Sequence, residues 1–150
     1  MGDQQPDGVN AFNRLYKELD DLYHDIALEL GISDSELTII YTVCRMGGDC
    51  AQKDICEQAC VSKQTINSAI RKMEQKGFLY LEPGSGRDKR DKRICLTEKG
   101  KAFSRENVCP LIRVEDEAFL DLAPEERQML LHLVGRYISG VRVRLNEAKR

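Results

Sequence analysis

Two groups of hydrogen-bonding and basic side chains stand close together in the middle of the chain. On a helix that follows Ser62, one face would collect Lys63, Gln64, Thr65, Asn67, Ser68, Arg71 and Lys72. The second group is basic and follows within one loop: Arg87, Lys89, Arg90, Lys92 and Arg93. Hydroxyl and amide groups can exchange hydrogen bonds with the edges of DNA bases, and lysine and arginine bind phosphate oxygens. These residues therefore suggest recognition of a polar, anionic partner.

The cysteines and histidines are the other residues with reactive side chains, and they do not favour an enzyme. No family-specific sequence surrounds any cysteine, and His24 and His132 fall on amphipathic helices. Cys56 and Cys60 are four residues apart without a nearby histidine, which is a poor set of zinc ligands. We expect no catalytic residue, no metal and no cofactor.

Two interpretations of the six cysteines stay open. Structural disulfides are not expected, because the chain starts without the hydrophobic stretch of a signal peptide. The preferred interpretation is that the thiols are small buried apolar residues. The alternative is a redox switch, because Cys50, Cys56 and Cys60 lie close to the polar helix.

Charge is distributed very unevenly along the 150 residues, although the formal net charge is only -2. Residues 1–40 contain nine acidic and two basic residues, whereas residues 83–109 contain eight basic and four acidic ones. A local basic segment is the electrostatic signature of a nucleic-acid binder, whatever the total charge. With 41% hydrophobic residues and no apolar run near 20 residues, we expect one soluble domain in the cytoplasm.

Helical periodicity predicts the elements before this region. Apolar residues recur every three or four positions over residues 9–30, which predicts a long amphipathic helix ending at Gly31. Ser33 and Glu36 have the spacing of a capping box, which predicts a second helix to about Met46. Its inward residues would be Leu37, Ile40, Tyr41 and Cys44. A short helix over 52–58 and a longer one from Ser62 to Gly77 follow, the longer one backed by Ile66, Ile70 and Met73.

After Gly77 the period changes to two, which predicts strands over 78–81 and 93–96 joined by a flexible basic loop. Thr97 can cap a further helix that takes in Phe103 and is bent or broken at Pro110. A last helix should start near Pro124. Its apolar stripe is Leu130, Leu133, Val134, Tyr137, Ile138, Val141 and Leu145.

This order of helix, tight turn, polar-faced helix and basic hairpin is that of a winged helix-turn-helix. Residues 52–57, 61–66 and 72–78, and above all the sequence DKRDKRICLTEKG at 88–100, closely resemble the MarR family of bacterial transcription regulators. The motifs cover residues 52–103, and the long flanking helices match the family's layout over nearly the whole chain. One departure is Cys60, because family members commonly have glycine or asparagine there, which tolerate a left-handed backbone.

The resemblance implies a role in DNA binding for twelve residues. Bases would be read by Gln64, Thr65, Asn67 and Ser68. Phosphates would be held by Gln52, Lys53, Ser62, Lys63 and Arg71. In the wing, Asp88 would pair with an arginine, while Lys89 and Arg90 would enter the minor groove. Thr97 and Gly100 would be structural, as a helix cap and a close-packing position.

We therefore expect a mostly α-helical winged helix-turn-helix with a small β-hairpin wing. Within one compact domain, residues 1–32 would form an N-terminal dimerisation helix, 33–100 the DNA-binding lobe and 101–150 the C-terminal dimerisation helices. The resemblance implies a homodimer, and the long apolar stripes agree with it. A two-fold dimer would place its recognition helices roughly 34–36 Å apart on a pseudo-palindromic operator.

The expected function is a sequence-specific regulator of transcription that binds double-stranded DNA. Most relatives are repressors that a small, often aromatic, molecule releases from DNA. One alternative is a thiol-based redox-sensing regulator of the same fold. The other is a winged-helix module that binds proteins and no DNA.

Overall fold

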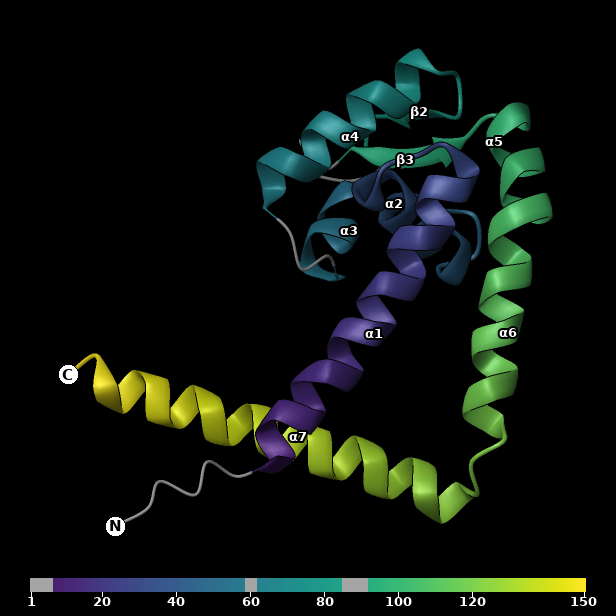
Figure 1. Cartoon of the computed structure of the whole chain (residues 1–150). Coiled ribbons are helices and arrows are strands. Elements are labelled where there is room, and N and C mark those ends of the chain that lie inside the picture. The colour runs from purple at the N-terminus through teal and green to yellow at the C-terminus, as the bar shows by residue number, and fades with distance from the viewer. Residues whose placement is uncertain (1–6, 59–61, 85–91) are drawn as a thin grey trace, which may run out of the picture. The chain divides into compact units, whose positions relative to one another are not determined.

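The computed structural model describes residues 7–58, 62–84 and 92–150, and Figure 1 traces them. They divide into two compact units, Met1–Cys109 and Pro110–Arg150. The first unit contains α1 (Asp7–Leu30), α2 (Asp34–Arg45), β1 (Asp49–Ala51), α3 (Gln52–Gln58), α4 (Lys63–Gln75), β2 (Leu79–Glu82), β3 (Arg93–Leu96), α5 (Glu98–Phe103) and a π-helical segment, Ser104–Val108. The fold is mostly helical with a small sheet, which confirms the predicted class.

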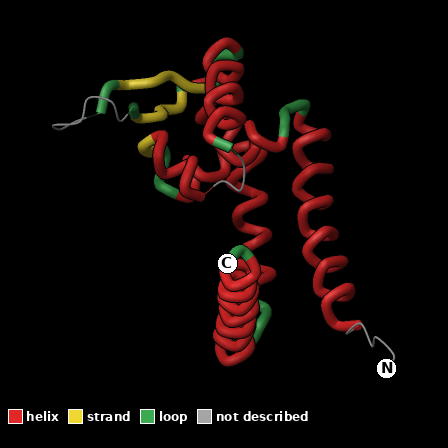
Figure 2. The backbone as a smooth tube through the Cα atoms, turned by 90° about the vertical axis from the view of Figure 1, so that its left-hand side faces the viewer, coloured by secondary structure: helices red, strands yellow, loops and turns green. Residues whose placement is uncertain are grey.

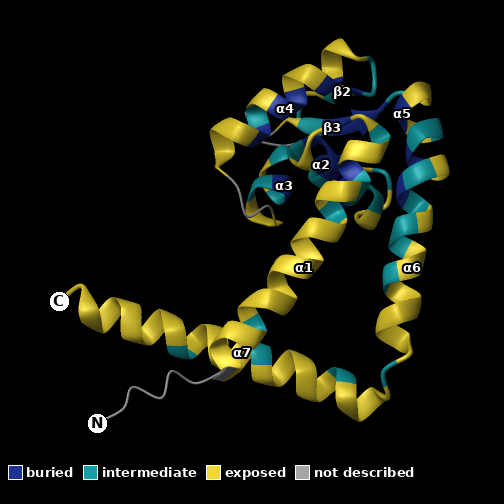
Figure 3. Ribbon diagram, viewed as in Figure 1, coloured by how far each residue is buried: buried dark blue, intermediate teal, exposed yellow. Residues whose placement is uncertain are grey.

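The core of the first unit lies where α2 and α4 meet the sheet (Figure 3). The largest fully buried side chains come from α2, α3, α4, β3 and the π-helical segment: Ile39, Ile40, Val43, Ile55, Ile66, Ile70, Met73, Ile94 and Val108. The predicted apolar back of α4 is confirmed. The predicted inward face of α2 is partly wrong, because Tyr41 and Cys44 are only half-buried. Since α2 contacts α1, α3, α4 and β1, residues on several of its sides are buried.

Local capping signals set the helix boundaries. Ser33 Oγ accepts a hydrogen bond from the backbone N–H of Glu36, 3.1 Å away, and Thr97 Oγ1 accepts one from Gly100 N at 3.0 Å. Gly31 and Gly77 end α1 and α4 with φ angles of 69° and 77°, a left-handed conformation that suits glycine. These features confirm the boundaries that the sequence predicts.

The sheet has three antiparallel strands in the order β1-β3-β2, and Figure 2 draws them in yellow. Glu82 pairs with Arg93 and Leu79 with Leu96, so β2 and β3 form the predicted hairpin. Strand β2 starts one residue later than expected, and Phe78 instead packs against the ring of Phe103, with centroids 5.0 Å apart. Strand β1 was not predicted from the sequence.

The bend expected at Pro110 takes another form. The chain stays helical through Pro110, and the distortion is the π-helical segment directly before it. Proline lacks an amide hydrogen and its ring crowds the carbonyl four residues earlier, so a widened turn at Ser104–Val108 relieves the clash without breaking the helix.

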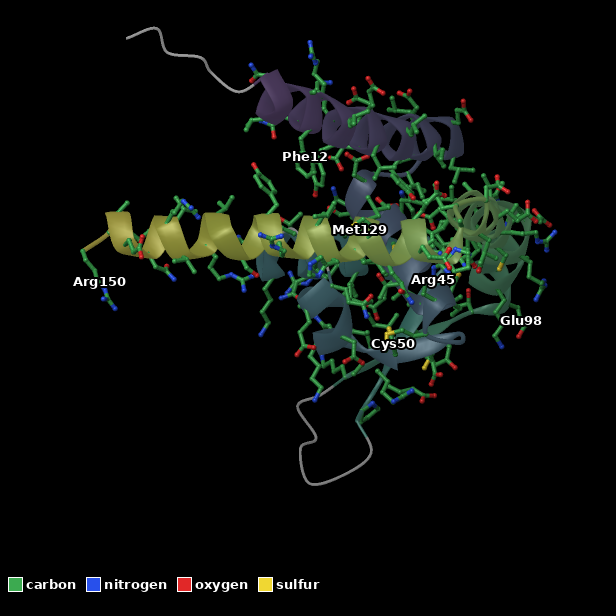
Figure 4. All side chains as sticks on the ribbon, turned by 90° about the horizontal axis from the view of Figure 1, so that it is seen from below. Phe12, Arg45, Cys50, Glu98, Met129 and Arg150 are labelled. Atoms are coloured by element: carbon green, nitrogen blue, oxygen red, sulfur yellow. The ribbon has the colours of Figure 1, made fainter. Side chains whose placement is uncertain are left out.

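The second unit contains α6 (Cys109–Leu120), apart from its first residue, and α7 (Pro124–Ala148). Neither helix has a buried residue, and side chains project from α7 along its whole length (Figure 4). Exposed apolar residues of α7 include Leu130, Leu133, Tyr137, Ile138, Val141 and Leu145. Among the helices that the structure describes, none is both long and apolar enough to cross a bilayer.

Candidate nucleic-acid interface

Helix α4 presents a polar face from a firmly anchored position. Its buried residues, Ile66, Ala69, Ile70 and Met73, fall on one side because they are spaced three and four apart. The exposed side chains of the helix include Lys63, Gln64, Thr65, Ser68, Arg71 and Lys72, and Glu74 and Gln75 are exposed in its last turn. An exposed row of amides, hydroxyls and cations on a well-packed helix is suited to the major groove of DNA.

The N-terminus of α4 is held by Ser62, which has extended backbone angles and caps the helix. Ser62 Oγ accepts a hydrogen bond from Thr65 N at 3.2 Å and lies 2.8 Å from Thr65 Oγ1. The hydroxyls of Ser62 and Thr65, which the resemblance assigns to DNA, are therefore also part of the helix cap. The cap orders the first turn, where side chains of a recognition helix reach bases.

The C-terminus of α4 is held by contacts that sequence reasoning missed. Lys76 Nζ donates a hydrogen bond to the buried carboxylate of Glu36 in α2, at 2.8 Å. Lys99 Nζ donates to the carbonyl of Lys76 at 2.6 Å, and Thr97 Oγ1 donates to the carbonyl of Gly77 at 2.5 Å. The capping-box spacing of Ser33 and Glu36 predicted a role for Glu36 only within its own helix. Nothing in the neighbouring sequence could therefore predict its pairing with Lys76.

Two predicted residues form a pair between α3 and α4. Gln52 opens α3 and Asn67 lies in the first half of α4, and both side chains are half-buried. Gln52 Nε2 donates a hydrogen bond to Asn67 Oδ1 at 2.5 Å. Lys53, beside Gln52, is exposed at the start of the same helix.

The base of the wing is braced by an ion pair. Arg93 Nη2 in β3 donates a hydrogen bond to Asp49 Oδ2 in β1, 2.6 Å away, and this bond raises the pKa of Arg93. Sequence reasoning assigned the bracing role to Asp88. Asp88, Lys89 and Arg90 lie outside the described residues.

Cysteine chemistry is disfavoured at three of the thiols. Burial raises the pKa of Cys50 from 9.0 to about 11, and burial also raises the pKa values of Cys44 and Cys95. A raised thiol pKa lowers the fraction of nucleophilic thiolate at neutral pH. Cys50 lies among the side chains at the sheet (Figure 4), and Cys60 lies outside the described residues. The described residues contain no group of three His, Cys, Asp or Glu side chains that could hold a metal.

Comparisons with known proteins find similarity to transcription regulators. A model described as "MarR family" matches residues 30–91. The Bacillus subtilis HTH-type transcriptional regulator YwoH is 25% identical over 108 residues, which cover 72% of this chain and 77% of YwoH.

Solved structures have the same fold. NMB1585, a MarR family regulator from Neisseria meningitidis, has a TM-score of 0.76 at 17% identity, covering 93% of this chain and 97% of its own. MepR from S. aureus, in a complex with DNA, has a TM-score of 0.68 at 17% identity, covering 87% of this chain and 94% of its own. The family-model match over the helix-turn-helix and the agreement in fold make this chain similar to the MarR family regulators in its winged helix.

Proposed function

We propose that the protein regulates transcription by binding double-stranded DNA at a specific sequence, as a homodimer on a pseudo-palindromic operator. The observation that supports this most directly is the exposed polar face of α4, whose two ends are held by the Ser62 cap and by the Glu36–Lys76 pair. MepR, a neighbour in fold, was solved bound to DNA, which adds support.

Within this proposal the twelve predicted residues divide by chemistry. Gln64, Thr65, Asn67 and Ser68 read base edges, because amides and hydroxyls can match donors and acceptors in the major groove. Gln52, Lys53, Ser62, Lys63 and Arg71 hold phosphates, which set position rather than sequence. Asp88, Lys89 and Arg90 act in the wing, Asp88 as a brace and the two cations at the minor groove.

The experiment that tests the proposal is selection of duplexes from a random DNA pool by the purified protein. The expected result is an enriched inverted repeat with half-sites about one helical turn apart. A folded protein that enriches no sequence would overturn the proposal. It would favour a winged-helix module that binds proteins instead.

Charge-to-alanine variants separate phosphate contacts from the overall charge effect. Lys63→Ala and Arg71→Ala should each weaken binding to all sequences and lower the slope of log affinity against log salt by about 0.9. Lys17→Ala is the matched control, since it removes the same charge from an exposed i,i+4 pair on α1. Equal slopes for all three variants would exclude Lys63 and Arg71 as phosphate ligands.

The dimer is proposed to form through the long first and last helices of two copies. Leu15 is 65% exposed and Leu22 60% exposed on α1, and apolar residues are similarly exposed along α7. A second copy of the chain would remove these surfaces from water, as an obligate dimer interface does. Analytical ultracentrifugation at micromolar concentration tests this.

Matched substitutions on α7 sharpen that test. Leu133→Glu places a charge on the apolar stripe and should convert the dimer to a monomer. Gln128→Glu adds the same charge at another exposed position of α7 and should leave the dimer intact. A wild-type chain that sediments as a monomer would contradict the dimer.

A repressor role with release by a small aromatic effector rests on the resemblance to the family. A ligand would act by favouring a spacing of the two DNA-binding lobes that does not match the operator. A panel of small phenols and aromatic acids, tested for release of the selected duplex, should include at least one that releases it. Transcription that rises on release would support repression, and a fall would support activation.

A further inference from the structure

The amide pair between Gln52 and Asn67 fixes which half of the Asn67 side chain is free. Gln52 is itself held in place, because its backbone N–H donates a hydrogen bond to the carbonyl of Lys92 at 2.9 Å. From there, Gln52 Nε2 donates to Asn67 Oδ1 at 2.5 Å. The acceptor half of the Asn67 amide therefore faces α3, where its oxygen accepts the hydrogen bond from Gln52.

The other half of that amide can face outward. Asn67 is half-buried, and it lies three residues after Gln64 and four before Arg71, both of which are exposed. Residues at these spacings are neighbours on one side of a helix. The Asn67 NH2 group thus lies at the border of the exposed polar face, and it can only donate hydrogen bonds.

We propose that Gln52 is a positioning residue that orients the Asn67 amide, so that Asn67 selects guanine or thymine at its position in the operator. In the major groove guanine presents the acceptors N7 and O6, thymine presents the acceptor O4, and cytosine presents only a donor. Adenine presents one acceptor and one donor, and its paired recognition by asparagine needs both the oxygen and the NH2 group aimed at the base, whereas Gln52 holds the oxygen toward α3. This inference rests on the proposed function.

Gln52→Glu tests the inference because it should reverse the orientation of the Asn67 side-chain amide. A carboxylate only accepts hydrogen bonds, so Asn67 would have to turn its NH2 group toward residue 52 and its oxygen toward the DNA. Duplex selection by Asn67→Ala first identifies the base position that depends on Asn67. At that position the wild type should prefer guanine or thymine over cytosine by about 5- to 10-fold, the size expected for one hydrogen bond of about 1 kcal/mol.

The Gln52→Glu variant should prefer cytosine or adenine at the same position. Comparing bases within each variant cancels the general loss of affinity that an added negative charge causes. Gln58→Glu is the matched control, because it adds the same charge to the exposed last residue of α3 and should keep the wild-type preference. Gln52→Ala frees the Asn67 amide to rotate, so the differences in affinity among the four bases at that position should become smaller. This second variant keeps the inference testable if Gln52→Glu does not fold.

Two results would overturn the inference while leaving the proposed function intact. One is a wild-type preference for cytosine or adenine at the position that depends on Asn67. The other is specific DNA binding by folded Gln52→Glu and Gln52→Ala with unchanged base preference. A wild type that selects no sequence would overturn the proposed function, and the inference with it.

Discussion

The carboxylate of Glu36 in α2 lies 2.8 Å from the ammonium group of Lys76, at the end of α4. The Glu36 side chain is 4% exposed and that of Lys76 is 42% exposed, so a buried charge is paired with one that still reaches water. Removing the lysine would leave a buried carboxylate without this partner, whereas removing the charge of the glutamate would leave a lysine that water can solvate. The two single substitutions should therefore lower the free energy of unfolding by unequal amounts.

We expect Lys76→Met to lower the free energy of unfolding by about 2–3 kcal/mol, less than the loss for a fully buried pair. Glu36→Gln should cost less, about 1 kcal/mol, because glutamine keeps the shape and can still hydrogen-bond. Urea denaturation of both single variants and the double variant measures the coupling. Single losses that simply add in the double variant would contradict a direct interaction.

Gly100 packs directly against backbone, and we expect Gly100→Ala to be strongly destabilising. A Cβ atom there would overlap the carbonyl group of Phe78, which is backbone and cannot rotate away, and would lie 3.4 Å from Leu96 Cβ. The expected loss is about 3 kcal/mol, the upper end of the range for overpacking. Gly8→Ala is the control, since no atom lies within 4 Å of its added Cβ, and thermal melting should show it near wild type. A Gly100→Ala variant as stable as Gly8→Ala would contradict this, because it would mean that the backbone at Phe78 can shift away from the added Cβ at little cost in stability.

The two serine caps provide a matched pair that separates stability from DNA binding. Ser33→Ala and Ser62→Ala each remove one cap, from α2 and α4, and each should cost about 1 kcal/mol of stability. Only Ser62→Ala disorders the first turn of the proposed recognition helix, so only it should weaken DNA binding, by about 5-fold for a loss of about 1 kcal/mol. Fluorescence anisotropy with the selected duplex measures this. Equal DNA affinities for the two variants would argue against α4 as the recognition helix.

The buried thiol of Cys50 should make stability fall at alkaline pH. Its pKa is raised from 9.0 to about 11 in the folded chain, so the folded state keeps this proton to a higher pH than the unfolded chain does. The resulting stabilisation is fully present below pH 9 and is lost as the pH rises toward about 11. It amounts to about 2–3 kcal/mol, from about 1.4 kcal/mol for each tenfold change in proton affinity.

Urea denaturation of the wild type and Cys50→Ala at several pH values isolates this effect, because other groups that titrate in this range are common to both proteins. The difference in unfolding free energy between the two proteins should be constant up to about pH 9 and then shrink. A difference that stays constant to pH 11 would mean that Cys50 titrates as in the unfolded chain.

The sequence by itself determined the features that depend on local chemistry. Ser33, Ser62 and Thr97 can be recognised as caps because each hydroxyl bonds to a backbone amide only three residues away. The apolar back of α4 follows from the helix period, and the alternating burial along β2 follows from the strand period. The family resemblance likewise rests on motifs that are contiguous in the chain.

Only the tertiary structure decided the contacts between residues far apart in sequence. Strand β1 forms because Asp49 pairs with Cys95, and its own three residues show no strand pattern. Glu36–Lys76, Asp49–Arg93 and Gln52–Asn67 join residues 40, 44 and 15 positions apart. A local pattern cannot specify such pairs, because the partner of a side chain depends on how the elements pack, and packing is a property of the whole core.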